Sequence, residues 1–337
     1  MDKILVTGGI GYIGSHTVVD LIENGYEAII VDDGSRSSSK VLDGIEKIVG
    51  KRPEFYKIDI CDKEKFKSVF ETEGKIAGII HFAAYKFVDE SVENPLMYYR
   101  NNLTGLLNVI ELANNYMVEN LVFSSSCSVY GEIKELPVSE NSKMMPIQSP
   151  YARTKLMGED ILEDMKTVSP VKYCSLRYFN PVGAHGSGHI GESPLTIPNN
   201  LVPRITAAAN GKMDKLKVWG HDYPTRDGTC IRDYIHVSDI AEAHTLALKY
   251  LEKQTKTDIH EIINLGSGEG VTVLELLSTF EKVTGIKLNY ELSERREGDV
   301  VAVYSDSSLA LKLLNWSPKR TTEDMMRSAW NWEKTNS

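Results

Sequence analysis

The chain has 337 residues, of which 42% are hydrophobic, and this length can bury the core of one large α/β domain and a smaller one without structural metals or disulfides. Its net charge of -9 argues against nucleic acid as a partner, and its four cysteines, scattered without C-x-x-C spacing, indicate neither a zinc site nor a disulfide framework and fit a reducing cytoplasm. No apolar run reaches the length of a membrane span and a strand pattern starts directly after Met1, so we expect neither a transmembrane helix nor a signal peptide.

The first predicted strand, residues 3–7, leads into a glycine-rich turn and a helix with one apolar face. The turn contains Gly8, Gly11 and Gly14, a spacing one residue longer in its first gap than G-x-G-x-x-G. Glycine allows a tight turn and a close approach of the backbone to a pyrophosphate, which the amino terminus of the helix attracts. The pattern predicts a dinucleotide site; the alternative is a glycine-rich turn without a ligand.

A second predicted strand, residues 28–32, ends in two acidic residues. Asp32 and Asp33 stand where an acidic side chain hydrogen-bonds the adenosine ribose in dinucleotide-binding proteins. Two carboxylates would repel a 2′-phosphate, so the sequence favours NAD over NADP. Arg36, close behind, leaves the phosphorylated cofactor as an alternative.

Further strands alternate with helical patterns, which predicts parallel pairing and a Rossmann-type doubly wound sheet. These strands are expected at residues 54–58, 77–82, 119–124 and 172–178. From residue 181 to 232 the chain is rich in Pro, Gly, Asn and His, as in long binding loops. We therefore predict a NAD-binding domain over 1–180 and a smaller α/β substrate domain over 181–337, with about 236–252 packing back on the first. Helices are expected at about 201–210, 238–251, 272–284 and 322–333.

Candidate catalytic residues follow the predicted strand 119–124. Ser126 stands at the carboxyl end of that strand, the edge where open α/β sheets bind ligands. Tyr151 and Lys155 are spaced i, i+4 on a helix that begins after Pro150, so they share one face. A tyrosine titrates near pH ~10, and an ammonium group beside it, with a positive nicotinamide ring, would lower that pKa and make it a base.

Seven stretches of the chain together resemble the UDP-glucose 4-epimerases, which are extended short-chain dehydrogenases/reductases. They are residues 3–16 (KILVTGGIGYIGSH), 123–131 (FSSSCSVYG), 151–155 (YARTK), 177–185 (RYFNPVGAH), 197–201 (IPNNL), 222–236 (DYPTRDGTCIRDYIH) and 295–299 (RREGD). The resemblance implies a tightly held NAD+ that takes hydride from sugar C4 while Tyr151 removes the 4-hydroxyl proton. A 4-keto sugar then turns over in the site and receives the hydride on its other face.

The resemblance also implies roles for individual residues. Ser126 and Lys155 would assist Tyr151 in catalysis. The cofactor would be held by Gly8, Gly11, Tyr12, Ile13, Gly14, Asp32, Asp33, Asp59, Ile60, Phe82, Ala83, Ala84, Lys86, Asn101, Ser124, Tyr151, Lys155 and Phe179. The UDP-sugar would be held by Ser126, Tyr151, Asn180, Asn200, Leu201, Trp219, Arg232, Arg296, Asp299 and Val303, and no metal is expected. Forked arginines suit a diphosphate, and Trp219 stands where the family packs the uracil ring.

Two other activities are weighed on the same scaffold. Dehydratases place an acidic residue just after the strand-end serine or threonine, whereas this chain has Cys127 and Ser128 there, which disfavours elimination. A catalytically silent NAD-binding regulator would be expected to lose Tyr151 or Lys155, and both are present. Another nucleotide-sugar epimerase of the same family remains an alternative.

Four features leave finer questions open. Val303 is smaller than the tyrosine that some relatives carry, which suggests that UDP-GlcNAc and UDP-GalNAc are accepted, unless the adjacent Tyr304 takes its place. The resemblance suggests a homodimer through helices near 92–116 and 151–166. A glycine loop at 266–270 could be a second nucleotide site, although a tight turn explains it. His185 and His189 are read as loop residues rather than zinc ligands.

Overall fold

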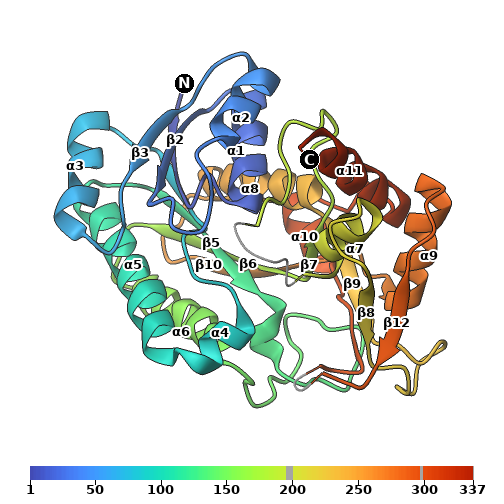
Figure 1. Cartoon of the computed structure of the whole chain (residues 1–337). Coiled ribbons are helices and arrows are strands. Elements are labelled where there is room, and N and C mark those ends of the chain that lie inside the picture. Colours follow the sequence, from blue (N-terminus) through green and yellow to red (C-terminus); the bar gives the residue numbers. More distant parts are fainter. Residues whose placement is uncertain (195–199, 297–298, 337) are drawn as a thin grey trace.

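The protein is built around a parallel sheet, as the alternation of strands and helices predicts. The structure is a computed structural model and describes residues 1–194, 200–296 and 299–336. Within these residues the sheet has seven strands, all parallel, in the order β10-β6-β5-β4-β1-β2-β3 (Figure 1). Their bounds are β1 (Lys3–Thr7), β2 (Glu27–Asp32), β3 (Glu54–Lys57), β4 (Gly78–His81), β5 (Asn120–Ser126), β6 (Lys172–Tyr178) and β10 (His260–Leu265). The predicted doubly wound fold is confirmed.

Helices cover both faces of the sheet because the central strands are apolar on both sides. One face packs against α1 (Tyr12–Glu23), α2 (Val41–Val49), α8 (Val237–Glu252) and α10 (Ser308–Leu314). The other face packs against α3 (Lys63–Glu73), α5 (Pro95–Asn115) and α6 (Pro150–Met165). The short α4 (Val88–Glu93) lies before α5, and a 3-10 turn, η1 (Cys127–Tyr130), follows β5.

The seventh strand comes from late in the chain. β10 pairs with β6 from His260↔Tyr173 to Leu265↔Tyr178, and the preceding α8 packs beside α1. Residues 237–265 therefore belong to the sheet and to the helices that cover it, although they follow the loop-rich segment in sequence. The domain boundary at residue 180 stays a prediction.

The remaining elements form a smaller unit beside the carboxyl edge of the sheet. A mixed sheet has the order β11-β9-β13, with β7 also paired to β9, and β8 pairs in parallel with β12. Its strands are β7 (Asn180–Val182), β8 (Leu216–Trp219), β9 (Ile231–His236), β11 (Gly270–Thr272), β12 (Tyr290–Ser293) and β13 (Ala302–Val303). Its helices are α7 (Leu201–Ala209), α9 (Val273–Thr284) and α11 (Thr322–Thr335). No helix in the described ranges is long and apolar enough to cross a membrane.

Candidate active site

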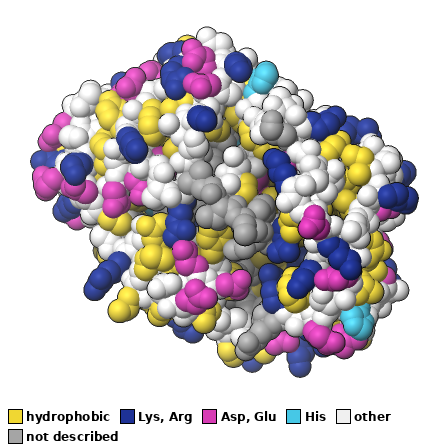
Figure 2. Space-filling model, viewed as in Figure 1, with side chains coloured by type: hydrophobic (Ala, Val, Ile, Leu, Met, Phe, Trp, Pro, Cys, Tyr) yellow, Lys and Arg dark blue, Asp and Glu magenta, His cyan; other side chains and the backbone are white. Residues whose placement is uncertain are grey.

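A cavity of about 1020 Å³ lies where the carboxyl ends of the sheet strands face the smaller unit. The ends of β2, β5 and β6 and the segment that follows β4 line it, together with the start of α1 and of α6. Figure 2 shows basic side chains on both sides of the hollow in this face. This is the edge at which doubly wound sheets bind ligands.

The glycine turn after β1 leaves no room for side chains. Gly8 has φ +72°, and a Cβ there would lie 2.7 Å from the backbone nitrogen of Ala83. A Cβ on Gly14 would lie 2.3 Å from the carbonyl oxygen of Gly8. Helix α1 begins after Gly11 with no side chain capping its first amides, so these N–H groups face the cavity as an anion site. The turn fits a dinucleotide pyrophosphate.

The acidic end of β2 favours the unphosphorylated cofactor. Asp32 lines the cavity and accepts a hydrogen bond from the Gly34 amide at 2.9 Å; burial, with a smaller contribution from Asp33, raises its pKa to about 6. Arg36 forms an ion pair with Glu90 at 2.8 Å, and its guanidinium lies 4.5 Å from the ring centre of Tyr85. Because Glu90 already neutralises Arg36, this arginine is poorly placed to attract a 2′-phosphate.

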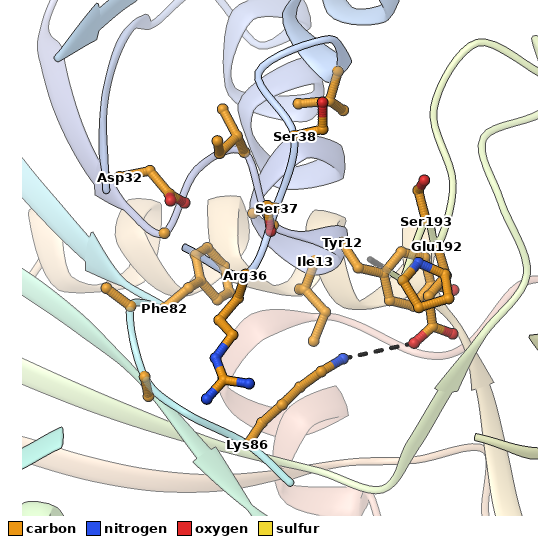
Figure 3. Close-up of a pocket in the computed structure, with 18 of the residues that line it drawn as sticks. Tyr12, Ile13, Asp32, Arg36, Ser37, Ser38, Phe82, Lys86, Glu192 and Ser193 are labelled. Carbon is orange, nitrogen blue, oxygen red and sulfur yellow. Dashed lines mark ion pairs between the residues drawn. The ribbon is translucent and has the colours of Figure 1, made fainter. Parts of the chain in front are cut away.

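A loop from the smaller unit closes over the cavity. Lys86, which follows β4, and Glu192 point toward one another across the cavity, with their charged atoms 3.6 Å apart (Figure 3). The phenol of Tyr12 on α1 donates to the carbonyl of Gly183 at 2.6 Å, and the Trp332 indole donates to the carbonyl of Glu192 at 2.9 Å. Parts of the chain more than a hundred residues apart therefore meet over the glycine turn.

The proposed catalytic residues meet at the junction of β5 and α6. Ser149 caps α6 by accepting from the Ala152 amide, and Pro150 occupies its first position, which sets Tyr151 in the first turn. Lys155 lies with its Nζ 6.0 Å from the Tyr151 ring centre and donates to the Ser124 carbonyl at 2.6 Å. Tyr151, Lys155 and Ser126 all line the cavity.

Electrostatics at this junction differ from the expectation drawn from sequence. Burial raises the pKa of Tyr151 to about 12, while the nearby Ser126 hydroxyl opposes that rise. Burial lowers the pKa of Lys155 to about 7, and Glu159 opposes that shift. The protein groups alone therefore do not make Tyr151 a base, because desolvation outweighs the hydrogen bond from Ser126. A cationic nicotinamide ring beside Tyr151 would act in the opposite direction and lower the pKa of this phenol.

Ser126 is oriented as a donor. Its Oγ accepts from the Ser128 amide at 3.2 Å and from the Ser128 hydroxyl at 2.9 Å. Since both lone pairs of a hydroxyl are then engaged, its own hydrogen is left to donate toward the cavity. The strand-end serine is thus arranged to hold a substrate oxygen.

The structure brings together all the residues assigned to the cofactor. They all line the one cavity: Gly8, Gly11, Tyr12, Ile13, Gly14, Asp32, Asp33, Asp59, Ile60, Phe82, Ala83, Ala84, Lys86, Asn101, Ser124, Tyr151, Lys155 and Phe179. Their individual contacts with a cofactor stay predictions.

The residues assigned to the sugar nucleotide fall into two groups. Ser126, Tyr151 and Asn200 line the cavity, and the Asn200 amide donates to Glu192 at 2.7 Å. The remaining ones do not line it: Asn180, Leu201, Trp219, Arg232, Arg296, Asp299 and Val303. Residues 197–199 of the IPNNL motif and Glu297 and Gly298 of RREGD lie outside the described residues.

Three of the second group form a cluster of their own. Arg232 and Arg296 both donate to one carboxylate oxygen of Asp299, each at 3.1 Å. Arg232 also donates to the Val300 carbonyl at 2.8 Å, which ties β9 to the segment before β13. Two guanidinium groups beside one carboxylate leave net positive charge, as a diphosphate site requires.

The side chains of Val303 and Tyr304 face different surroundings. Val303 packs against the apolar cluster that contains Val129, Tyr130 and Phe179 and lies beside η1. A Cβ built on Gly270 would lie 3.0 Å from the ring of Tyr304, which places that ring at the start of β11. Of the two residues, Val303 is the one that packs against the cluster beside η1.

Sequence reasoning missed Tyr178 and Glu192. Tyr178 ends β6 and lines the cavity, its hydroxyl is buried without a hydrogen-bond partner among the described residues, and burial raises its pKa. Its position at a strand end next to Phe179 was the available signal. Glu192 lies in an irregular loop, where no local pattern marks it.

The glycine loop 266–270 holds a carboxylate of the protein itself. Asp233, which is fully buried, accepts from the amides of Ser267 at 2.7 Å and Gly268 at 3.2 Å, and from the Ser305 amide and hydroxyl at 2.9 and 2.6 Å. These loop amides are therefore engaged internally, which supports the reading as a turn. His185 hydrogen-bonds Ser187, and no group of metal-binding side chains occurs in the described ranges.

Known proteins are similar to this chain over almost its whole length. Residues 5–329 match the family model described as GDP-mannose 4,6 dehydratase. The chain belongs to this family. The UDP-glucose 4-epimerase of Bacillus subtilis is 46% identical over 334 residues, covering 99% of this chain and 97% of that protein. The resemblance inferred from the motifs is confirmed.

Solved structures of epimerases share the fold closely. The UDP-glucose 4-epimerase from Stenotrophomonas maltophila, with bound NAD and formylated UDP-arabinopyranose, has a TM-score of 0.95 at 42% identity and covers 99% of this chain and 98% of its own. The enzyme from Bifidobacterium longum, in complex with NAD+ and UDP, has a TM-score of 0.94 at 41% identity with the same coverage.

Proposed function

We propose that the protein is an NAD-dependent UDP-sugar 4-epimerase that interconverts UDP-glucose and UDP-galactose through a 4-keto intermediate. The observation that carries this is the meeting of Tyr151, Lys155 and Ser126 with the glycine turn in one cavity. A bound NAD+ would accept hydride from sugar C4 and return it to the opposite face. The residues around it bind the cofactor, orient the sugar and move the hydroxyl proton.

Each catalytic residue has a role that its surroundings support. The Tyr151 oxygen takes the proton of the sugar 4-hydroxyl and returns it when the keto group is reduced. Ser126 donates a hydrogen bond to the same sugar oxygen. Lys155, held by the Ser124 carbonyl, supplies positive charge beside the phenol when it is protonated. No net oxidation results, because the hydride and the proton both return to the sugar.

The family model carries the name of a dehydratase, so elimination is the second candidate. Protonation of a leaving hydroxyl requires an acid beside the strand-end serine. Here Cys127 and Ser128 follow Ser126, and burial raises the pKa of the Cys127 thiol to about 12. A thiol that holds its proton so firmly is a weak acid for this step, which favours epimerisation.

Turnover of UDP-galactose tests the proposal. Purified protein is incubated with UDP-galactose and the C4 epimer is quantified by chromatography. Tyr151→Phe removes the phenol oxygen and is expected to lower turnover at least about a hundredfold, the scale of general base catalysis. Tyr116→Phe, at an exposed hydroxyl far from the cavity, is the matched control. If Tyr151→Phe kept full turnover, the assignment of Tyr151 as the proton acceptor would be refuted.

We propose further that N-acetylated UDP-sugars are also substrates. Val303 lies beside η1, which directly follows Ser126, and the Tyr304 ring lies at the start of β11; both positions support the smaller side chain as the one near the sugar. Val303→Tyr is expected to lower turnover of UDP-GalNAc at least about tenfold relative to UDP-galactose, the scale of steric exclusion from a pocket. Equal ratios in the variant and the unaltered protein would contradict this.

A homodimer through α5 and α6 is proposed as the assembly. Leu107 on α5 is 50% exposed and Met157 on α6 is 38% exposed, while Leu106 and Ile110 are buried against the sheet. Only part of the apolar pattern on α5 is thus free to pack against a second copy. Leu107→Glu with Met157→Glu is expected to give a monomer by light scattering, and an unchanged mass would exclude this surface.

A further inference from the structure

A buried ion pair lies directly behind the catalytic junction and makes no contact with the cavity. Glu159 and Arg177 are 3% and 2% exposed, and the guanidinium grips both carboxylate oxygens, with Nε at 2.9 Å and Nη2 at 2.6 Å. Neither residue lines the cavity. Burying such a pair costs desolvation that apolar side chains of similar volume would avoid, so stability alone is a weak reason for its presence.

The pair is joined to the catalytic residues in two ways, through helix α6 and through a hydrogen bond to Ser125. Glu159 lies one helical turn after Lys155 on α6. Its Oε1 also accepts from the Ser125 hydroxyl at 2.5 Å. Ser125 stands between Ser124, whose carbonyl holds the Lys155 ammonium, and Ser126. One carboxylate therefore connects the end of β5 to the helix that carries Tyr151 and Lys155.

The far side of the pair is anchored as well. Arg177 on β6 donates from Nη1 to the Tyr130 hydroxyl at 2.9 Å, and Tyr130 donates to Asn264 on β10 at 2.7 Å. Asn264 in turn donates to the Val138 carbonyl at 3.0 Å. Because each side chain in this hydrogen-bond network has a partner, the Glu159 carboxylate has one defined position.

Glu159 is also the one charged group whose electrostatic effect on Lys155 is resolved among the described residues. The ionisable groups around Lys155 and Tyr151 are Glu159 on α6, His81 on β4, Cys127 in η1 and Tyr178 on β6. Burial lowers the pKa of His81 to about 3, and it raises the pKa values of the Cys127 thiol and the Tyr178 phenol, so these three are neutral near pH 7. The carboxylate of Glu159 is left to favour the ammonium form of Lys155.

We propose that Glu159, held by Arg177, is a positioning residue that fixes Ser126 and Lys155 against Tyr151 and places a carboxylate one helical turn from Lys155. This inference rests on the proposed function, since it assigns the pair a part in the same proton transfer. Glu159 does not line the cavity and would act through Ser125 and Lys155.

Three variants separate positioning from a merely structural role. Ser125→Ala removes one hydrogen bond to Glu159 and keeps the ion pair. Glu159→Gln keeps an acceptor for Ser125 and removes the negative charge. Glu159→Gln with Arg177→Met removes both charges and avoids leaving Arg177 buried and unpaired, in case the single variant does not fold.

Ionisation of Tyr151 is measured in the NAD-loaded protein as the ultraviolet difference absorbance between each variant and the same variant carrying Tyr151→Phe. In the loaded protein the cationic nicotinamide ring would bring the Tyr151 pKa down toward that of Lys155, so that the two groups titrate together. Glu159→Gln is then expected to move the Tyr151 midpoint about one pH unit to the alkaline side, because Lys155 loses its ammonium proton at lower pH. The double variant is expected to move it in the same direction by less. Ser125→Ala is expected to lower kcat about tenfold at nearly unchanged KM, as for a small misplacement of reacting groups.

A structural role predicts a different pattern. The melting temperature would fall in the variants, while the Tyr151 midpoint in the double variant and the kcat of Ser125→Ala would equal those of the unaltered protein. If either of these two values is unchanged, the proposal is overturned. The ionisation midpoint does not depend on turnover. A protein that fails to epimerise UDP-galactose would therefore refute the proposed function separately from this inference.

Discussion

Replacement of Gly14 by alanine is expected to weaken NAD binding through a clash that the backbone cannot relieve. The added Cβ would lie 2.3 Å from the Gly8 carbonyl oxygen and 2.9 Å from Gly9 Cα, whereas an ordinary contact is at least 3.4 Å. The start of α1 must therefore move about 1 Å away from the turn, the difference between 3.4 and 2.3 Å. Both neighbours are backbone atoms, so no side-chain rotation can absorb this shift.

The cost can be estimated from two effects. In a helix, alanine is normally more stable than glycine by about 1 kcal/mol, but overpacking costs about 1–3 kcal/mol and displaces the amides that face the pyrophosphate. Loss of one hydrogen bond to a charged group is worth about 1.5–3 kcal/mol, which corresponds to a loss of affinity of at least about tenfold.

The assay measures the NAD content of the purified protein after acid release, together with its affinity for added NAD. Gly186→Ala is the matched control, because Gly186 is exposed and a Cβ there meets no atom within 4 Å. If Gly14→Ala retained the same NAD content and affinity as Gly186→Ala, the turn would not be the pyrophosphate site and the reasoning would be refuted.

Two further predictions concern cofactor choice and acid stability. Glu90→Gln removes the carboxylate that pairs with Arg36, so affinity for NADP is expected to rise about tenfold, the scale of one charged hydrogen bond. The control is Glu93→Gln, at an exposed residue of the same helix. An unchanged affinity would show that Arg36 does not face the ribose. Burial lowers the pKa of His236 to about 3, so below about pH 6.5 the unfolded chain binds a proton that the folded protein does not, and stability falls as pH falls by about 1.4 kcal/mol per unit for this group. His236→Asn keeps an acceptor for the Ser238 amide at the start of α8 and is expected to make the loss between pH 6.5 and 5 shallower by about that amount in urea titrations, whereas an identical slope would contradict the assignment.

Local patterns in the sequence were enough for the fold class and for three parts of the cavity, whereas the other expected cofactor residues came from the family resemblance. These parts are the Gly8, Gly11 and Gly14 turn, the acidic end of β2 and the pair Tyr151 and Lys155, each recognised from residue types a few positions apart. The capping box at the start of α9, Thr272 with Glu275, is present for the same reason. Such features follow from periodicity and turn chemistry, so they can be read without knowledge of distant partners.

Tertiary structure decided the features that join distant segments. The pairing of β10 with β6, the meeting of Lys86 with Glu192 and the grip of Arg177 on Glu159 have no local signature, because their partners lie on different strands and loops. Burial then set the direction of the Tyr151 pKa, which the spacing of Tyr151 and Lys155 alone had suggested in the opposite sense. The sequence specified which groups carry the chemistry, and packing determined how much water and charge surrounds each of them.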